Sequence, residues 1–184
     1  MSDPILRDPL HTQPGHLLRR AQQISASIFH DEIGGQLTPI QYAVLCVLLD
    51  HPGVDQVSVA GLAAIDTSTA ASVATRLEEK GLLSRQVDPA NRRQRILLLT
   101  DQGRDLLQAL NGAIGRLHQR IFEQFTSEEE AQFMVLLQKL VDVNNHQSRA
   151  PFTVARSGPS SPDTARHVGD MPAEAGERLR QEGQ

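Results

Sequence analysis

Three arginines lie within four positions of the chain, at Arg92, Arg93 and Arg95. They follow the turn-forming residues Pro-Ala-Asn and precede an apolar run, so we expect them at the tip of a β-hairpin. The whole chain of 184 residues has a formal charge of −4, which makes this a local concentration of cations. Guanidinium groups bind phosphate with paired hydrogen bonds. The alternative is that these cations protect a strand edge from pairing with other chains.

A second group of polar residues shares one face of the segment 68–80, which we expect to be a helix capped by Asp66 or Thr67. Thr69, Ser72 and Arg76 are spaced three and four residues apart on its outward face, and Ser68 lies at its start. Small hydroxyl groups allow a helix to approach a DNA groove closely, and an arginine can contact a phosphate or a guanine. The alternative is an ordinary solvated face. The inward face is apolar: Ala70, Val73, Ala74 and Leu77.

The elements around these residues predict a mainly α fold with a two-stranded β wing. Apolar periodicity and capping signals place helices at 16–33, 38–51, 59–65, 68–80 and 126–144, and a long helix from 101 with a stripe that reaches Ile121. They place strands at 82–88 and 95–100. A short helix, a turn, a capped helix and a hairpin in this order form the winged helix-turn-helix. The long flanking helices have apolar stripes without local cover, so we expect a symmetric homodimer through the first and last two helices. Those stripes include Leu110, Leu117, Ile121, Leu136 and Leu140.

The segments "LTPIQYAVLCVLLDHPG" (37–53) and "STAASVATRLEEKGLLSRQVDPANRRQRILLLTDQG" (68–103) resemble the MarR family of dimeric winged-helix regulators. The resemblance extends over about residues 15–147, and it implies a protein that binds double-stranded operator DNA. Arg93 matches the arginine that enters the minor groove in family members. Where the family's wing has an aspartate, this chain has Asn91, which we expect to fix the turn through its side-chain amide. The expected DNA contacts are Thr67, Ser68, Thr69, Ser72, Arg76, Asn91, Arg92, Arg93 and Arg95.

The stretch "PGHLLRRAQQ" (14–23) resembles family members that repress operons for the breakdown of aromatic acids, nearest to nicotinate-pathway repressors of the NicR/BpsR type. The resemblance implies a small aromatic carboxylate effector, nicotinate-like or hydroxybenzoate-like, held by Arg19 or by its rival Arg20. A guanidinium near a dimer interface also has the fork geometry that a carboxylate needs, although a surface ion pair is the alternative. His16 and Tyr42 would add polar contacts, but a tyrosine in an aliphatic helix is more often a core residue.

Composition divides the chain into three parts. Residues 1–14 are expected to form an N-terminal arm, and residues 15–147 the regulator domain, with its DNA-reading part at about 37–100. Residues 148–184 are rich in Pro, Gly, Ser and charge without periodicity, which predicts a disordered tail. We expect truncation after Gln147 to leave dimerisation and DNA binding nearly intact.

Other functions are not indicated by the sequence. The seven histidines include no pair at helical ligand spacing, so neither a metal nor another cofactor is expected. There is no glycine-rich phosphate loop and no nucleophile elbow, so an enzyme is not expected. A single cysteine, an apolar stretch of only eight residues (42–49) and an acidic, Pro-rich start favour a cytoplasmic location.

The sequence therefore predicts a repressor that an aromatic acid releases from an inverted-repeat operator. Two alternatives stay open. One is a winged-helix module that binds proteins and never touches DNA. The other is a redox sensor acting through Cys46, although a cysteine inside an apolar helix is more often buried and inert.

Overall fold

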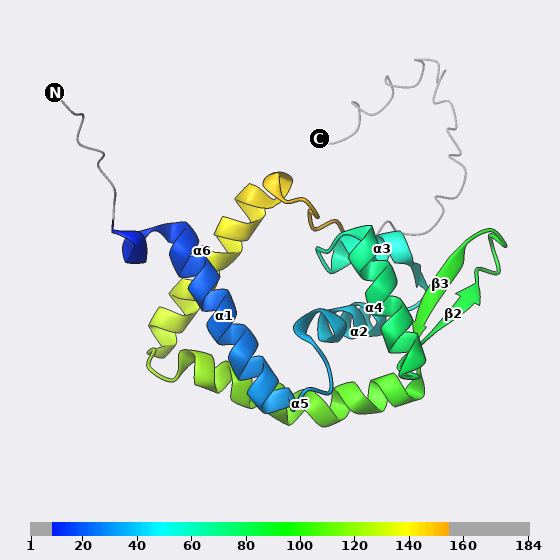
Figure 1. The fold of residues 1–184 in the computed structure, drawn as a ribbon, viewed down its shortest axis with the longest axis horizontal. Helices are drawn as coiled ribbons and strands as arrows, with labels where there is room; N and C mark the ends of the chain where they lie inside the picture. Colours follow the sequence, from blue (N-terminus) through cyan, green and yellow to red (C-terminus); the bar gives the residue numbers. More distant parts are fainter. Residues whose placement is uncertain (1–8, 155–184) are drawn as a thin grey trace, which may run out of the picture.

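The computed structural model describes residues 9–154 and confirms a mainly α, winged helix-turn-helix fold (Figure 1). Residues 1–8 of the expected arm and 155–184 of the expected tail lie outside the described residues. The helices are η1 (Leu10–Thr12), α1 (Pro14–Ile33), α2 (Pro39–Asp50), α3 (Gln56–Leu62), α4 (Thr67–Glu79), α5 (Asp101–Phe122), α6 (Ser127–Asn144) and η2 (Asn145–Gln147). The strands are β1 (Val54–Asp55), β2 (Leu83–Val87) and β3 (Arg95–Leu99).

Local capping signals set the helix starts. Thr38 and Gln41 form a complete capping box at α2, and Thr126 and Glu129 form another at α6. At α5, the hydroxyl of Thr100 accepts a hydrogen bond from the backbone N–H of Gly103. Because each of these contacts spans only three residues, the expected helix starts agree closely with the observed ones.

The helix α3 begins earlier than its sequence predicts. Its cap is Asp55, whose carboxylate accepts a hydrogen bond from the backbone N–H of Ser58 at 2.7 Å, so the helix starts at Gln56 and the expected start at residue 59 was wrong. The helix ends at Leu62, and Ala64 then adopts a left-handed conformation with φ of 51°. That turn leads into Asp66, which caps α4 and completes the helix-turn-helix.

The sheet has one strand more than expected. β2 and β3 form the hairpin, with Leu83 opposite Leu99 and Val87 opposite Arg95. The two-residue β1 pairs with the other side of β3, so the strand order is β1-β3-β2. This short strand ties the start of α3 to the base of the wing.

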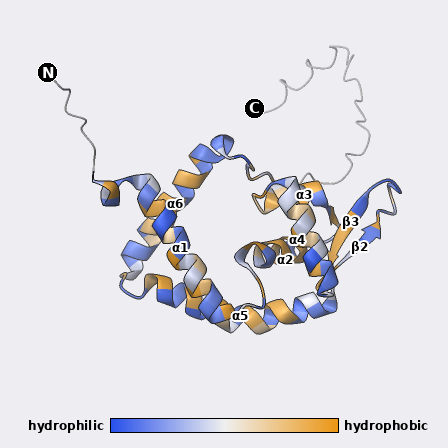
Figure 2. Ribbon diagram, viewed as in Figure 1, coloured by the Kyte–Doolittle hydropathy of each residue, from blue (hydrophilic) through white to orange (hydrophobic). Residues whose placement is uncertain are grey.

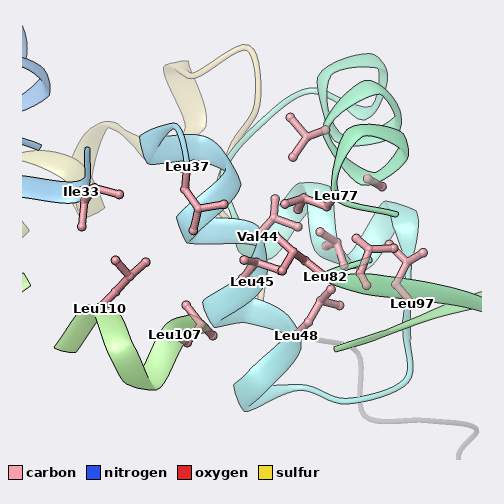
Figure 3. Packing of buried hydrophobic residues seen from close by; sticks show 14 of the residues in the cluster. Ile33, Leu37, Val44, Leu45, Leu48, Leu77, Leu82, Leu97, Leu107 and Leu110 are labelled. Atoms are coloured by element: carbon pink, nitrogen blue, oxygen red, sulfur yellow. The ribbon is translucent and has the colours of Figure 1, made fainter. Parts of the chain in front are cut away.

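The hydrophobic core lies mainly in the part of the chain that we call the head, residues 37–100, and extends to the end of α1 and to α5 as far as Ala113. Leu45, Leu48, Leu77, Leu83 and Leu97 are fully buried there (Figure 3 shows the packing of this cluster). Leu107 and Leu110 of α5 pack against this cluster (Figure 3). Leu110 is therefore buried within one chain, and its expected place on the uncovered stripe was wrong.

The rest of the structure, which we call the base, consists of α1, the second half of α5, and α6. α1 packs along α5, and an ionic cluster joins them: Arg116 and Arg120 both contact Glu32. α6 has no buried residue, and many of its exposed residues are apolar; Figure 2 shows hydrophobic positions along this helix. Within residues 9–154, no single helix is long and apolar enough to span a membrane, and only α3 and α4 taken as a bent pair pass that test.

Candidate nucleic-acid interface

The start of α4 is organised around one carboxylate. Asp66 accepts hydrogen bonds from the backbone N–H of Thr69, from the Thr69 hydroxyl at 2.6 Å and from the Ser68 hydroxyl. The two hydroxyls hold the pKa of Asp66 well below its ordinary value, so the group stays ionised. Ser68 and Thr69 thus direct their hydrogens at Asp66, and their oxygens are left as acceptors.

The outward face of α4 carries the expected polar residues. Thr67, Ser72 and Arg76 are exposed, and Ser72 donates a hydrogen bond to the carbonyl of Thr69. Arg76 has no acidic partner within the described part of the chain. A cation on the open face of the second helix of a helix-turn-helix can reach a phosphate or a base edge.

The tip of the wing is a folded turn. Asp88 accepts a hydrogen bond from the N–H of Ala90, and the side-chain oxygen of Asn91 accepts one from the N–H of Arg93 at 3.2 Å. Asn91 thus fixes the turn through its side-chain amide, as expected. Arg92 and Arg93 project from this turn; like Arg95 at the start of β3, both are exposed. None of the three forms an ion pair with another residue of the described range.

A contact that the sequence does not indicate braces the wing against α3. The side-chain amide of Gln94 donates a hydrogen bond to Asp55 at 2.5 Å. Asp55 uses its other oxygen to cap α3. One carboxylate thus holds both the wing tip and the first helix of the helix-turn-helix, although Gln94 and Asp55 are 39 positions apart.

A second brace joins the wing to α4. Arg85 of β2 forms an ion pair with Glu78 at 2.9 Å and donates a hydrogen bond to the hydroxyl of Thr75. The three residues line a hollow of about 560 Å³ between α4 and the wing. The charge of Arg85 is therefore neutralised internally, whereas Arg76 and the three arginines at the wing tip have no acidic partner in the described part of the chain.

The residues of the expected effector site lie partly together. On α1, Arg19 donates a hydrogen bond to the side-chain oxygen of Gln23 at 2.8 Å and contacts the ring nitrogen Nδ1 of His16 at 3.3 Å. The partners of the Arg19 guanidinium among the described residues are thus a side-chain amide and an imidazole ring, and neither is a carboxylate. Arg20 is exposed on the same helix.

Tyr42 is not brought to this group within one chain. Its ring packs edge-on against Phe29, with centroids 5.9 Å apart. Phe29 lies ten residues beyond Arg19 on α1, which is about 15 Å along a helix. Burial and the neighbouring Cys46 raise the pKa of Tyr42 to about 12. Tyr42 thus packs in a partly buried position of α2, and its part in effector binding stays a prediction.

Cys46 is half-buried in α2 beside Tyr42. Burial raises the pKa of its thiol, which disfavours the reactive thiolate. The structure therefore favours the packing role of Cys46 over redox sensing.

Known proteins match the chain over most of its described length. Residues 37–94 match the model of the MarR family. The HTH-type transcriptional repressor NicR of Pseudomonas putida is 33% identical over 131 residues, which cover 71% of this chain and 83% of NicR.

Solved structures agree with the fold. The structure of the PcaV transcriptional regulator of Streptomyces coelicolor, in complex with its natural ligand, superimposes with a TM-score of 0.70 and 36% sequence identity. The match covers 75% of this chain and 98% of the PcaV chain. BpsR of Bordetella bronchiseptica has a TM-score of 0.70 and 35% sequence identity to this chain. The DNA binding of BpsR is regulated by 6-hydroxynicotinic acid. The match covers 74% of this chain and 98% of BpsR.

Proposed function

Because the chain belongs to the MarR family of transcriptional regulators, we propose that it is a repressor that a small aromatic carboxylate releases from its operator. The DNA-contacting surface consists of the outward face of α4 and the wing tip. The protein acts as a homodimer, so two copies of α4 read the two halves of an inverted repeat about one helical turn apart, roughly 34 Å.

The observation that carries the DNA part of this proposal is the set of cations without acidic partners. Arg76, Arg92 and Arg93 are exposed, whereas Arg85 beside them is neutralised by Glu78. A chain of net charge −4 thus presents positive charge where a winged helix meets DNA. Edge protection accounts for cations on a strand edge, but it does not account for Arg76 on a helix.

The test is the salt dependence of duplex binding. Each neutralised phosphate releases a counterion. The logarithm of the binding constant should therefore fall steeply and linearly with the logarithm of the salt concentration. Duplexes are first selected by the protein from a random pool, and the selected sequences should be inverted repeats. Failure to enrich any duplex, or an affinity independent of salt, would favour the protein-interaction module.

The effector part of the proposal rests on Arg19. Its guanidinium is exposed and, among residues 9–154, contacts Gln23 and His16 and no carboxylate, so an incoming carboxylate can take up its charge with paired hydrogen bonds. Regulation of BpsR by 6-hydroxynicotinic acid supports an aromatic acid as the ligand class. The ligand would release DNA by binding one dimer geometry better than the DNA-competent one.

Titration of the DNA complex with aromatic acids tests this role. Arg19→Ala should bind the selected duplex like the wild type but require at least about ten times more ligand for release, since a charge-assisted pair contributes about 1.5–3 kcal/mol. Arg20→Ala is the matched control on the next position of α1 and should respond normally. If Arg20→Ala alone loses the response, Arg20 is the carboxylate anchor instead.

A further inference from the structure

A short segment connects the end of the base to the head. After η2 the chain runs in extended form through residues 151–154 and reaches α3, as Figure 1 shows. Asn145 fixes this path, because its side chain both accepts a hydrogen bond from the N–H of Phe152 at 2.8 Å and donates one to the carbonyl of Phe152 at 2.9 Å. We call residues 148–154 the strap.

The strap ends on a glycine inside α3. The backbone N–H of Thr153 donates a hydrogen bond to the carbonyl of Gly61 at 3.0 Å. A Cβ atom built on Gly61 would overlap the hydroxyl of Thr153 and lie 3.3 Å from its Cβ. Glycine inside a helix costs about 0.5–1 kcal/mol relative to alanine. The seven-residue α3 therefore carries an unfavourable residue at the point where the strap requires space.

The strap closes a ring. α5 joins the head to the base at one end, and the strap joins the end of α6 to α3 at the other (Figure 1). The head is also joined to the base by the short connection between α1 and α2, which lies beside α5. A head attached only on this side could turn about α5, whereas the strap attaches it on the opposite side and restricts the turn. In a dimer the orientation of each head determines the distance between the two copies of α4.

We propose that the strap holds the head at a fixed angle to the base and thereby sets the half-site spacing that the dimer accepts. This inference rests on the proposed function, because spacing has meaning only for a dimer that reads two half-sites. If the strap has this role, the part of the chain needed for full DNA binding ends at Val154 and not at Gln147, where the sequence placed the end of the domain.

The experiment uses full-length variants and duplexes that the wild type selects from a random pool. These duplexes are then remade with one base pair added or removed between the half-sites. Gly61→Ala should displace Thr153 and release the strap, and Asn145→Ala should release it without touching α3. Thr153→Gly removes the clashing side chain, so the double variant Gly61→Ala/Thr153→Gly should regain the wild-type behaviour. Val57→Ala, an exposed position of the same helix, is the matched control.

We expect the wild type to lose affinity when the spacing changes. Gly61→Ala and Asn145→Ala should bind the original duplex about tenfold more weakly, because a freer head must be ordered on binding, and should discriminate less between spacings. Hydrogen exchange at the Thr153 amide reports the strap directly. It should be slow in the wild type, the control and the double variant, and fast in the two released variants.

Two results would overturn the inference. The Thr153 amide could exchange rapidly in the wild type, in which case the strap does not form. Alternatively, the released variants could exchange rapidly yet keep the wild-type spacing preference, in which case the strap does not set it. If the wild type selects no duplex, the proposed function fails and the spacing inference with it, while slow exchange at Thr153 would still establish the strap.

Discussion

In the head, most apolar side chains are buried, and the arginines at the wing tip have no acidic partner among the described residues. In the base, Arg116 and Arg120 are paired with acidic residues, and the apolar side chains of α6 are exposed. Leu45 and Leu77 are fully buried in the head, while Leu136 and Leu140 of α6 are 57% and 42% exposed. Arg93 has no ion pair within residues 9–154, but Arg120 contacts both Asp31 and Glu32. The head thus lacks a charged partner, and the base lacks an apolar one. The phosphates of DNA provide the charged partner of the head, and a second copy of the chain provides the apolar partner of the base.

The largest effect is expected when the exposed apolar surface of the base is made polar, because that surface forms the dimer. Leu136→Asp should yield a monomer by light scattering, because a charge would be buried in the dimer. Loss of the second head should weaken operator binding by about a hundredfold or more. Val57→Asp changes an apolar residue of the head that is at least as exposed as Leu136, and it should leave the mass unchanged. A dimer that survives Leu136→Asp would place the interface elsewhere.

Packing density differs between the two regions and can be tested with glycines of α5. A Cβ on Gly103 would collide with the carbonyl oxygen of Leu82 in the head, so Gly103→Ala should lower the free energy of unfolding by about 1–3 kcal/mol. A Cβ on Gly115 in the base meets nothing within 4 Å. Gly115→Ala should therefore be neutral or stabilising by up to about 1 kcal/mol. Denaturant titrations measure both, and equal effects would contradict the comparison.

Removing a free cation should matter more for DNA than removing a paired one. Arg93→Ala should weaken operator binding about tenfold and reduce the salt slope by about one counterion. Arg116→Ala, whose guanidinium is held by Glu32, should leave affinity and slope unchanged. If Arg93→Ala keeps the full slope and affinity, the wing arginines serve only the strand edge.

The smallest expected effect concerns the ionic cluster of the base. Arg116 and Arg120 lower the pKa of Glu32 below its ordinary value of 4.5. A lowered folded-state pKa adds stability above the ordinary value, and that stability is lost as the pH falls through the folded pKa. Glu32→Gln should therefore lower the thermal midpoint slightly at neutral pH. The difference from wild type should vanish well below pH 4.5, and thermal scans across this range measure it.

How far the sequence predicted the structure depends on the distance between interacting residues. The helix starts at Thr38 and Thr126 follow from contacts between residues three positions apart, so patterns of residue type were sufficient. The free arginines were also predictable, because a charged turn in an alternating hairpin has to be exposed. Leu110 was placed wrongly, since the stripe on α5 does not indicate which half of the helix the head covers.

The parts that the sequence could not predict are contacts between distant segments. Nothing near Gln94 indicates that its partner is Asp55, and nothing near Gly61 indicates Thr153. Nothing in the sequence indicates that Glu78 neutralises Arg85. Such pairs arise only when packing brings two elements together. A glycine inside a short helix was the one available signal, because it is locally unfavourable.

The shared use of Asp55 by α3 and the wing has a consequence for exchanging parts between related regulators. A wing transplanted as residues 88–94 would bring its own side chain at position 94, and the recipient's Asp55 would meet whatever that side chain is. A lysine there could keep the brace, while an acidic residue would face a carboxylate and push the wing away from α3. Wing and first helix are thus one interchangeable unit, and swaps that carry residues 54–56 along with the wing should succeed more often than swaps of the wing alone.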